Sequence, residues 1–328
     1  MDKSSADAFV YAKASGMLAK SFVGPRTEKI FEPHKLSELW ALLFSSEVPL
    51  VPEVLLAKEI EKTAEYQFVK DFSMLLNCYS KPDRVSLYLL KSFEYSNLRE
   101  IVFALSNGEQ NLPVLVDIGN FSELKINKWP NLEKITEKTS FEWYNKIPSN
   151  KEQSSFDFKL DLQFVRGLWK AVESLPSSEK NPVKSFIKEK LILDNCLWAI
   201  RLKNYYKMEK EEIIKNLFSI QEVPSEKDIL CEEAIKILDF DLDSYDSWKK
   251  WKYKNLLNEN LEGDVWFIDP IWVQQSARIY LVKKAYKSFH QYPFTANVLV
   301  SWFFIKQHEL DCIRNATENL RINGSEKY

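Results

Sequence analysis

A similar helical pattern occurs three times along this chain, at intervals of roughly a hundred residues. In each copy an apolar opening leads through a polar or acidic stretch to a polar residue close before a leucine, and apolar residues and an arginine follow. A pattern that recurs at such an interval indicates one supersecondary unit used three times. It favours an assembly of helical lobes over a single catalytic cleft. The copies are YLLKSFEYSNLREIVFAL at Tyr88–Leu105, FIKEKLILDNCLWAIRLK at Phe186–Lys203 and WFFIKQHELDCIRNATENL at Trp302–Leu320.

The composition also favours helices. Only 7 of the 328 residues are glycine, whereas an average usage of about 7% would give more than twenty. Few glycines leave few tight turns, hairpins and phosphate-binding loops. Apolar residues recur at intervals of three and four, and no alternation with a period of two extends over more than a few residues. We therefore predict an all-α protein, long enough for two or three cores.

The apolar spacing and the prolines predict where the helices lie. The second copy of the pattern belongs to a long helix that starts at Asn181-Pro182, and the third belongs to a last helix that follows Pro293 and ends near Gly324. Further helices are expected over Ala6–Phe22, Leu36–Leu43, Pro52–Asn77, Phe156–Ser174, Ile229–Leu238 and Ser247–Glu259, and from Pro270 through Phe289.

Two breaks divide the chain into three predicted lobes. The first is the turn-rich stretch 107–120, in which Asn111–Ile118 could form a short extended segment, although Pro113 argues against a central strand. The second is Pro224-Ser225-Glu226, which indicates the start of a helix. The predicted lobes are residues 1–115, 116–223 and 224–328.

Charge, cysteine usage and hydropathy exclude several classes of function. The net charge of −2 gives no bulk attraction for nucleic acid. The start of the chain lacks the features of a signal peptide, and Val298–Ile305 is too short and too interrupted to span a membrane. Four widely separated cysteines predict structural thiols, with neither a disulfide framework nor a zinc site. We expect a cytoplasmic protein.

Two local motifs have competing interpretations. Asp239–Asp246 begins like a calcium loop, but Ser244 and Lys250 stand where such a loop needs glycine and glutamate, so an acidic connector is the better interpretation. The run Trp248–Lys254 interleaves aromatic and basic residues. It fits a helix with an aromatic buried face, a protein-docking surface or a single-strand nucleic-acid site. We predict no catalytic, cofactor-binding or metal-binding residue.

Three segments carry a resemblance to a known family. They are FVYAKASGMLAKSF at Phe9–Phe22, KLILDNCLWAIRLKNYYKMEKEEI at Lys190–Ile213 and YPFTANVLVSWFFIKQHELDCIRNATENL at Tyr292–Leu320. In their order and spacing they resemble the family of central-stalk rotor adaptors of V-type (A-type) ATPases, known as the C/AC39 or d family. The likeness covers nearly the whole length. Ser15 and Gly16 depart from it, because basic residues are common there in the family.

The resemblance implies a fold and a mechanical role. It implies a funnel or collar of three related helical lobes around a pseudo-threefold axis, placed between the central shaft and the proteolipid ring in the membrane. Such a subunit is not catalytic. It would be a rigid spacer that passes torque, peripheral to the membrane, present as one copy in the complex and without a nucleic-acid partner. The alternatives are a generic α-helical scaffold or adaptor for protein assembly and, more remotely, an all-α enzyme with a scattered site.

Four residues are candidates for contacts with partner subunits. Arg201 and Arg314 occupy matching places in the second and third copies of the pattern. Asp194 and Glu309 are expected to orient these arginines, because charge-assisted pairs between helices fix their register. An intramolecular bond to a neighbouring lobe is an equally good interpretation of each arginine.

Overall fold

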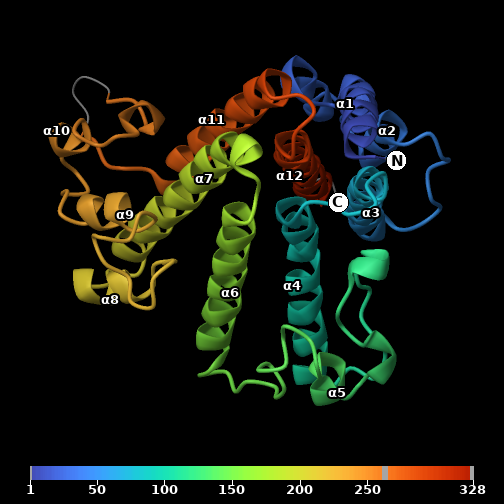
Figure 1. The fold of residues 1–328 in the computed structure, drawn as a ribbon, viewed down its shortest axis with the longest axis horizontal. Helices are drawn as coiled ribbons and strands as arrows, with labels where there is room; N and C mark the ends of the chain where they lie inside the picture. Colours follow the sequence, from blue (N-terminus) through green and yellow to red (C-terminus); the bar gives the residue numbers. More distant parts are fainter. Residues whose placement is uncertain (1, 261–264, 326–328) are drawn as a thin grey trace. The chain divides into compact units, whose positions relative to one another are not determined.

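The computed structural model describes residues 2–260 and 265–325 (Figure 1). Within these ranges the chain forms helices and irregular connections without a β-strand, so the predicted all-α class is confirmed. Four short 3-10 helices accompany the α-helices: η1 (Gly24–Phe31), η2 (Gly119–Phe121), η3 (Ile126–Lys128) and η4 (Lys254–Leu256). The α-helices are α1 (Lys3–Lys20), α2 (Leu36–Leu43), α3 (Glu53–Leu76), α4 (Arg84–Ser106), α5 (Leu132–Thr136), α6 (Gln153–Glu173), α7 (Ser177–Asn204), α8 (Lys210–Lys215), α9 (Glu232–Ile237), α10 (Tyr245–Trp248), α11 (Pro270–Gln291) and α12 (Asn297–Ser325).

The three copies of the repeated pattern lie in three long helices, α4, α7 and α12. Local signals fix where several helices begin. The Asp2 carboxylate accepts the Ser5 backbone N–H at 2.9 Å at the start of α1, and Asp83 accepts the Ser86 N–H at 2.8 Å at the start of α4. A capping carboxylate satisfies N–H groups that have no partner within the first turn. These starts could be predicted from the sequence because the interaction spans only three residues.

Two predicted boundaries are wrong. Helix α7 starts at Ser177, and Pro182 lies within it. The helix continues past this proline because Val183, Phe186 and Ile187 are buried and hold the following turns in place. Helix α9 is shorter than the predicted Ile229–Leu238, because the Asp228 side chain accepts the Leu230 N–H at 2.9 Å and holds a turn there.

The predicted helix over Ser247–Glu259 is also wrong. This segment contains the last residues of α10 and the 3-10 helix η4. Trp248, Trp251 and Tyr253 are all buried. Their spacing of three and then two residues cannot place them on one helical face, so the backbone turns to bury all three. Of the three interpretations of this run, the buried aromatic cluster is the one that the structure supports.

The described chain packs as two compact units. Unit 1 comprises Met1–Ile147 and Ala285–Tyr328, and unit 2 comprises Pro148–Lys284. The last turns of α11 belong to unit 1 and the rest to unit 2. These boundaries differ from the predicted lobe boundaries, and the three-lobe division remains a prediction. Residues 1, 261–264 and 326–328, which the predicted first and third lobes include, lie outside the described residues.

Each unit has a core built on one copy-bearing helix. In unit 1, α12 packs mainly against α3 and also contacts α1, α2 and α4. The Trp302 ring stacks on Phe72 and Phe68 at centroid distances of 5.8 Å and 5.9 Å. In unit 2, α7 packs against α6, α8 and α9. Among the described helices, none is long and apolar enough to cross a bilayer.

Candidate functional site

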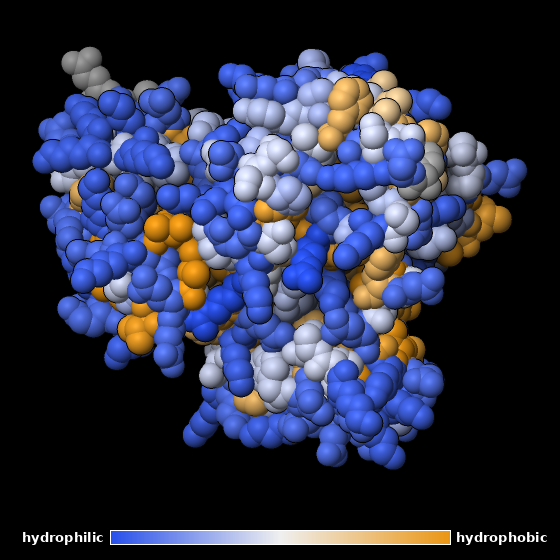
Figure 2. Space-filling view, in the orientation of Figure 1, coloured by the Kyte–Doolittle hydropathy of each residue, from blue (hydrophilic) through white to orange (hydrophobic). Residues whose placement is uncertain are grey.

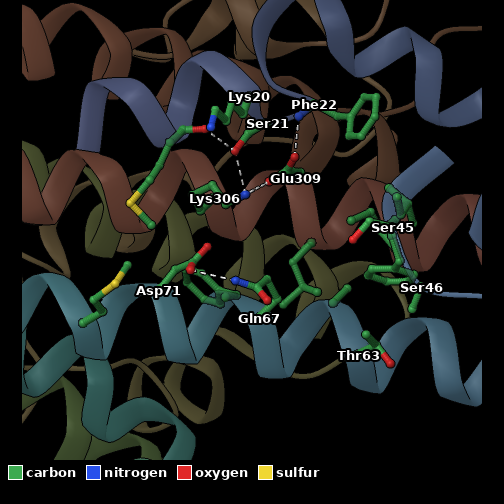
Figure 3. Close-up of a pocket in the computed structure, with 18 residues that line it drawn as sticks. Lys20, Ser21, Phe22, Ser45, Ser46, Thr63, Gln67, Asp71, Lys306 and Glu309 are labelled. Atoms are coloured by element: carbon green, nitrogen blue, oxygen red, sulfur yellow. Dashed lines mark hydrogen bonds and ion pairs between the residues drawn. The ribbon is translucent and has the colours of Figure 1, made fainter. Parts of the chain in front are cut away.

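A pocket of about 500 Å³ opens in unit 1 between the end of α1, the α2–α3 connection, α3 and α12 (Figure 3). Apolar side chains, among them Phe44, Phe68 and Leu310, line part of its surface. Charged and amide groups line the rest and come from helices far apart in the sequence. The pocket therefore combines an apolar wall with a polar wall, as sites that receive a side chain or a small ligand do.

The polar groups of α12 form one side of this pocket. Glu309 accepts the Phe22 backbone N–H and the Lys306 ammonium, and Lys306 also donates to the Ser21 hydroxyl at 2.8 Å. Figure 3 shows the two side chains pointing toward the end of α1. The Glu309 side chain is only 6% exposed. Because a buried ion pair is stabilising only when its remaining hydrogen bonds are made, these bonds let the pair lock α12 against α1.

The facing groups on α3 are less completely paired. Gln67 donates to one oxygen of Asp71 at 2.7 Å. Burial raises the pKa of Asp71 above its ordinary value, and the Lys306 charge opposes this shift in part. The pocket thus holds two carboxylates and a buried ammonium, with Lys20 at its exposed rim. The sequence analysis identified only Glu309 among these groups. Lys306 was within reach, since residues at i and i+3 lie on one face of a helix.

The four predicted contact residues lie in two separate places. Arg314 on α12 donates to the Glu65 carboxylate of α3 at 2.7 Å and lies 3.9 Å from Asp311. Its side chain is partly exposed. Glu309, on the same helix, pairs with Lys306 and not with Arg314. The expectation that Glu309 orients Arg314 is therefore wrong.

The other two residues lie on α7 in unit 2. Arg201 donates to the Gln274 side-chain oxygen of α11 at 2.5 Å. Asp194 pairs with Lys190 of its own helix, also at 2.5 Å. The expectation that Asp194 orients Arg201 is wrong for the same reason, because a lysine one turn away takes the carboxylate. Both arginines make the intramolecular bonds that the alternative interpretation anticipated.

The polar residue of the repeated pattern has a shared structural role in the first two copies. Asn97 donates to the Val116 carbonyl at 2.7 Å and accepts the Val116 N–H at 2.8 Å. Asn195 makes the same two bonds to Phe218, each at 2.8 Å, and donates to the Leu230 carbonyl at 2.9 Å. In both cases a buried amide brackets the backbone of a later connection. The spacing revealed the position of these residues but not this role.

The third copy has Glu309 at the corresponding place, and it accepts the Phe22 backbone N–H. Here the anchored segment is the end of α1, which lies far earlier in the chain. The same position of the pattern thus anchors backbone outside its own helix in all three copies. This similarity is a structural argument that the copies are related.

Comparison with known proteins agrees with this architecture. A family model described as ATP synthase (C/AC39) subunit matches residues 49–324. The chain belongs to this family. It is a family of non-catalytic subunits of rotary ATPases, and the resemblance noted in the sequence is confirmed. The match runs through both compact units and includes all three copies of the repeated pattern.

A protein of Treponema pallidum (strain Nichols) is similar along most of its length. It carries the description "Uncharacterized protein" and is 26% identical over 309 residues, which cover 94% of this chain and 91% of that protein. The similarity therefore extends over both units and adds no statement about activity.

Proposed function

We propose that this protein is the rotor adaptor of a V-type ATPase or ATP synthase: a rigid spacer that joins the central shaft to the proteolipid ring and passes torque to ion translocation. The observation that carries the proposal is the family match over residues 49–324. In this proposal the chain forms three related lobes around a pseudo-threefold axis. It lies on the cytoplasmic face of the membrane, as one copy in each complex.

The packing supports a part that must resist deformation. Torque passes efficiently only through a body whose interior does not yield, and close-packed side chains have low compressibility. In unit 1 the stacked rings of Trp302, Phe72 and Phe68 fill the contact between α12 and α3. The Asn97 bracket and the buried Lys306–Glu309 pair tie connections to these helices. A spacer of this kind needs a stiff frame and no reaction centre.

Isolation of the tagged full chain from its native membranes tests the proposal. We expect the catalytic ATPase subunits, the shaft subunits and the proteolipid to co-purify, identified by mass spectrometry. Recovery of the chain with a set of proteins unrelated to a rotary ATPase would contradict the proposal and support the generic scaffold instead.

Arg201 and Arg314 remain the proposed contact residues for the shaft or the ring, with Asp194 and Glu309 nearby on the same helices. We expect Arg201→Ala and Arg314→Ala each to lower the recovery of partner subunits while the chain stays folded, because losing a partly exposed charge pair costs only about 0–1 kcal/mol of stability. Arg321→Ala is a matched control, since Arg321 forms an exposed pair with Glu318 on the same helix as Arg314. Unchanged recovery of all partners with both variants would contradict the contact role.

A further inference from the structure

The connection between α2 and α3 exposes a cluster of apolar side chains in unit 1. Leu50 is fully exposed, at 105% of its reference area, and Val54 and Leu55 are 57% and 47% exposed. Figure 2 shows a hydrophobic area at the edge of the molecule where Figure 1 shows this connection. We call this cluster the apolar knob; it comprises Pro49, Leu50, Val51, Val54 and Leu55. Contiguous exposed apolar groups of this kind mark interaction sites.

The knob is held in a fixed shape by its stem. The Trp40 indole N–H donates to the Ser46 carbonyl at 3.0 Å, and the Trp40 and Phe44 rings contact each other at a centroid distance of 4.7 Å. Two prolines flank the tip, and Pro52 caps the start of α3. Proline fixes its own φ, so the tip has few alternative conformations. A preformed loop loses little entropy when it docks, which favours binding.

Leu50 contributes little to the core of unit 1, because its whole side chain faces solvent. A polar residue would serve the fold equally well there. The apolar character of the tip therefore needs a cause outside the chain, and burial against another molecule provides one. Removing apolar surface from water stabilises a complex by about 25 cal/mol for each Å² buried.

The charges around the knob define what it can dock against. Glu47 and Glu53 are exposed on either side of the tip, and the nearest cation along the chain, Lys58, follows more than one helical turn later. Acidic flanks oppose contact with an anionic bilayer, whose surface attracts clusters of Lys and Arg. They also oppose a symmetric contact between two copies, which would place like charges together.

We infer that the apolar knob docks into an apolar socket bordered by Lys or Arg side chains on another protein of the rotary ATPase complex. This inference rests on the proposed function and names a surface for it. The stem residues Phe44, Ser45 and Ser46 also line the pocket of Figure 3. A partner seated on the knob therefore extends to the mouth of that pocket.

The test compares tagged full-length chains isolated from native membranes. The Leu50→Glu/Val51→Glu double variant is expected to recover about tenfold less, or lower still, of the partner than the unchanged chain, as loss of an interface hot spot does. Its melting temperature is expected to stay the same, because Leu50 is fully exposed. Val223→Glu is the matched control, since Val223 is an exposed valine in unit 2, and we expect it to leave recovery unchanged.

Charge reversal provides the second arm. Glu47→Lys/Glu53→Lys is expected to weaken recovery of the same partner, and added salt is expected to weaken the unchanged complex. Stronger recovery after charge reversal would overturn the cationic border. Binding of the purified chain to phosphatidylglycerol vesicles that is lost in Leu50→Glu/Val51→Glu would overturn a protein partner in favour of lipid. Loss of a homodimer in that variant would overturn it in favour of a second copy.

The outcomes separate this inference from the proposed function. If the unchanged chain recovers no protein of a rotary ATPase, the proposed function fails and the inference fails with it. If the unchanged chain and the Leu50→Glu/Val51→Glu variant recover the same proteins equally, the knob inference alone is overturned.

Discussion

At the residue scale, the middle of α7 shows why a poor helix former is placed in a helix. Asparagine competes with the backbone for hydrogen bonds and is neutral to unfavourable in helix interiors. Asn195 nevertheless lies fully buried within α7. Its amide makes bonds to Phe218 and Leu230 that no apolar side chain could make. The bracket holds the irregular connection that follows α8 against the helix.

We predict that Asn195→Ala lowers the free energy of unfolding by about 1–3 kcal/mol, because buried backbone groups of Phe218 and Leu230 lose their partner. Chemical denaturation measures the change. Asn181→Ala on the same helix is the control, since Asn181 is exposed, and we expect it to change stability by about 0.5 kcal/mol at most. A loss for Asn195→Ala as small as that of the control would contradict the role of the bracket.

The Asp71 carboxyl gives a prediction about pH. Burial raises its pKa, so the folded state binds this proton more tightly than the unfolded state does. The ionised carboxylate therefore lowers stability at neutral pH, and this penalty disappears as pH falls through the pKa of the folded state. We predict that Asp71→Asn is more stable than the natural chain at pH 7, and that the difference shrinks toward pH 3. Gln67 can still donate to the Asn side-chain oxygen, so the variant keeps the bond at that position.

Melting curves of both chains between pH 3 and pH 7 measure the effect. A variant less stable at pH 7 would show that attraction between Asp71 and Lys306 outweighs the cost of burial.

At the element scale, α12 owes its place in unit 1 to its apolar opening. Trp302 is completely buried and its ring lies nearly parallel to those of Phe72 and Phe68, with interplanar angles of 11° and 22°. Phe303, the next residue, contacts the same two phenylalanines, each at a centroid distance of 5.1 Å. The cluster joins α12 to α3 through ring contacts that add to the burial of apolar area.

We predict that Trp302→Ala lowers the free energy of unfolding by about 3–5 kcal/mol, as large-to-small changes of buried aromatic residues do. Trp302→Phe should cost less, since a phenyl ring still fills most of the site. Thermal and chemical denaturation of the two variants measure both costs. Equal losses for the two substitutions would contradict a role based on filled volume.

At the scale of the whole chain, the two compact units differ in how they are made. Unit 2 is one continuous stretch, whereas unit 1 combines both ends of the chain. Helix α12 must therefore return to α3 and α1 before unit 1 is complete. Long-range pairing of this kind carries the entropy cost of closing the intervening chain.

We predict that local damage stays within its unit. Hydrogen exchange measured by mass spectrometry should show faster exchange in α3 and α4 for Trp302→Ala, with α7 and α9 unchanged. Asn195→Ala should show the reverse pattern, with faster exchange across α8 and α9. Faster exchange throughout the chain for either variant would show one cooperative body in place of two.

The sequence alone determined the helical class, most helix positions and the family. These properties depend on interactions between residues three or four apart, such as the Asp2 cap and the apolar spacing of α3, and on the order of segments along the chain. Where aromatic residues fell at uneven spacing, as at Trp248, Trp251 and Tyr253, burial overrode the helical pattern.

Only the tertiary structure decided the partners of the site residues. Arg201 bonds Gln274 and Arg314 bonds Glu65, residues 73 and 249 positions away. The choice among many possible carboxylates and amides depends on which helices pack together, and that depends on burial summed over the whole chain. Spacing within one helix carries no information about it, which is why the expected pairings with Asp194 and Glu309 were wrong.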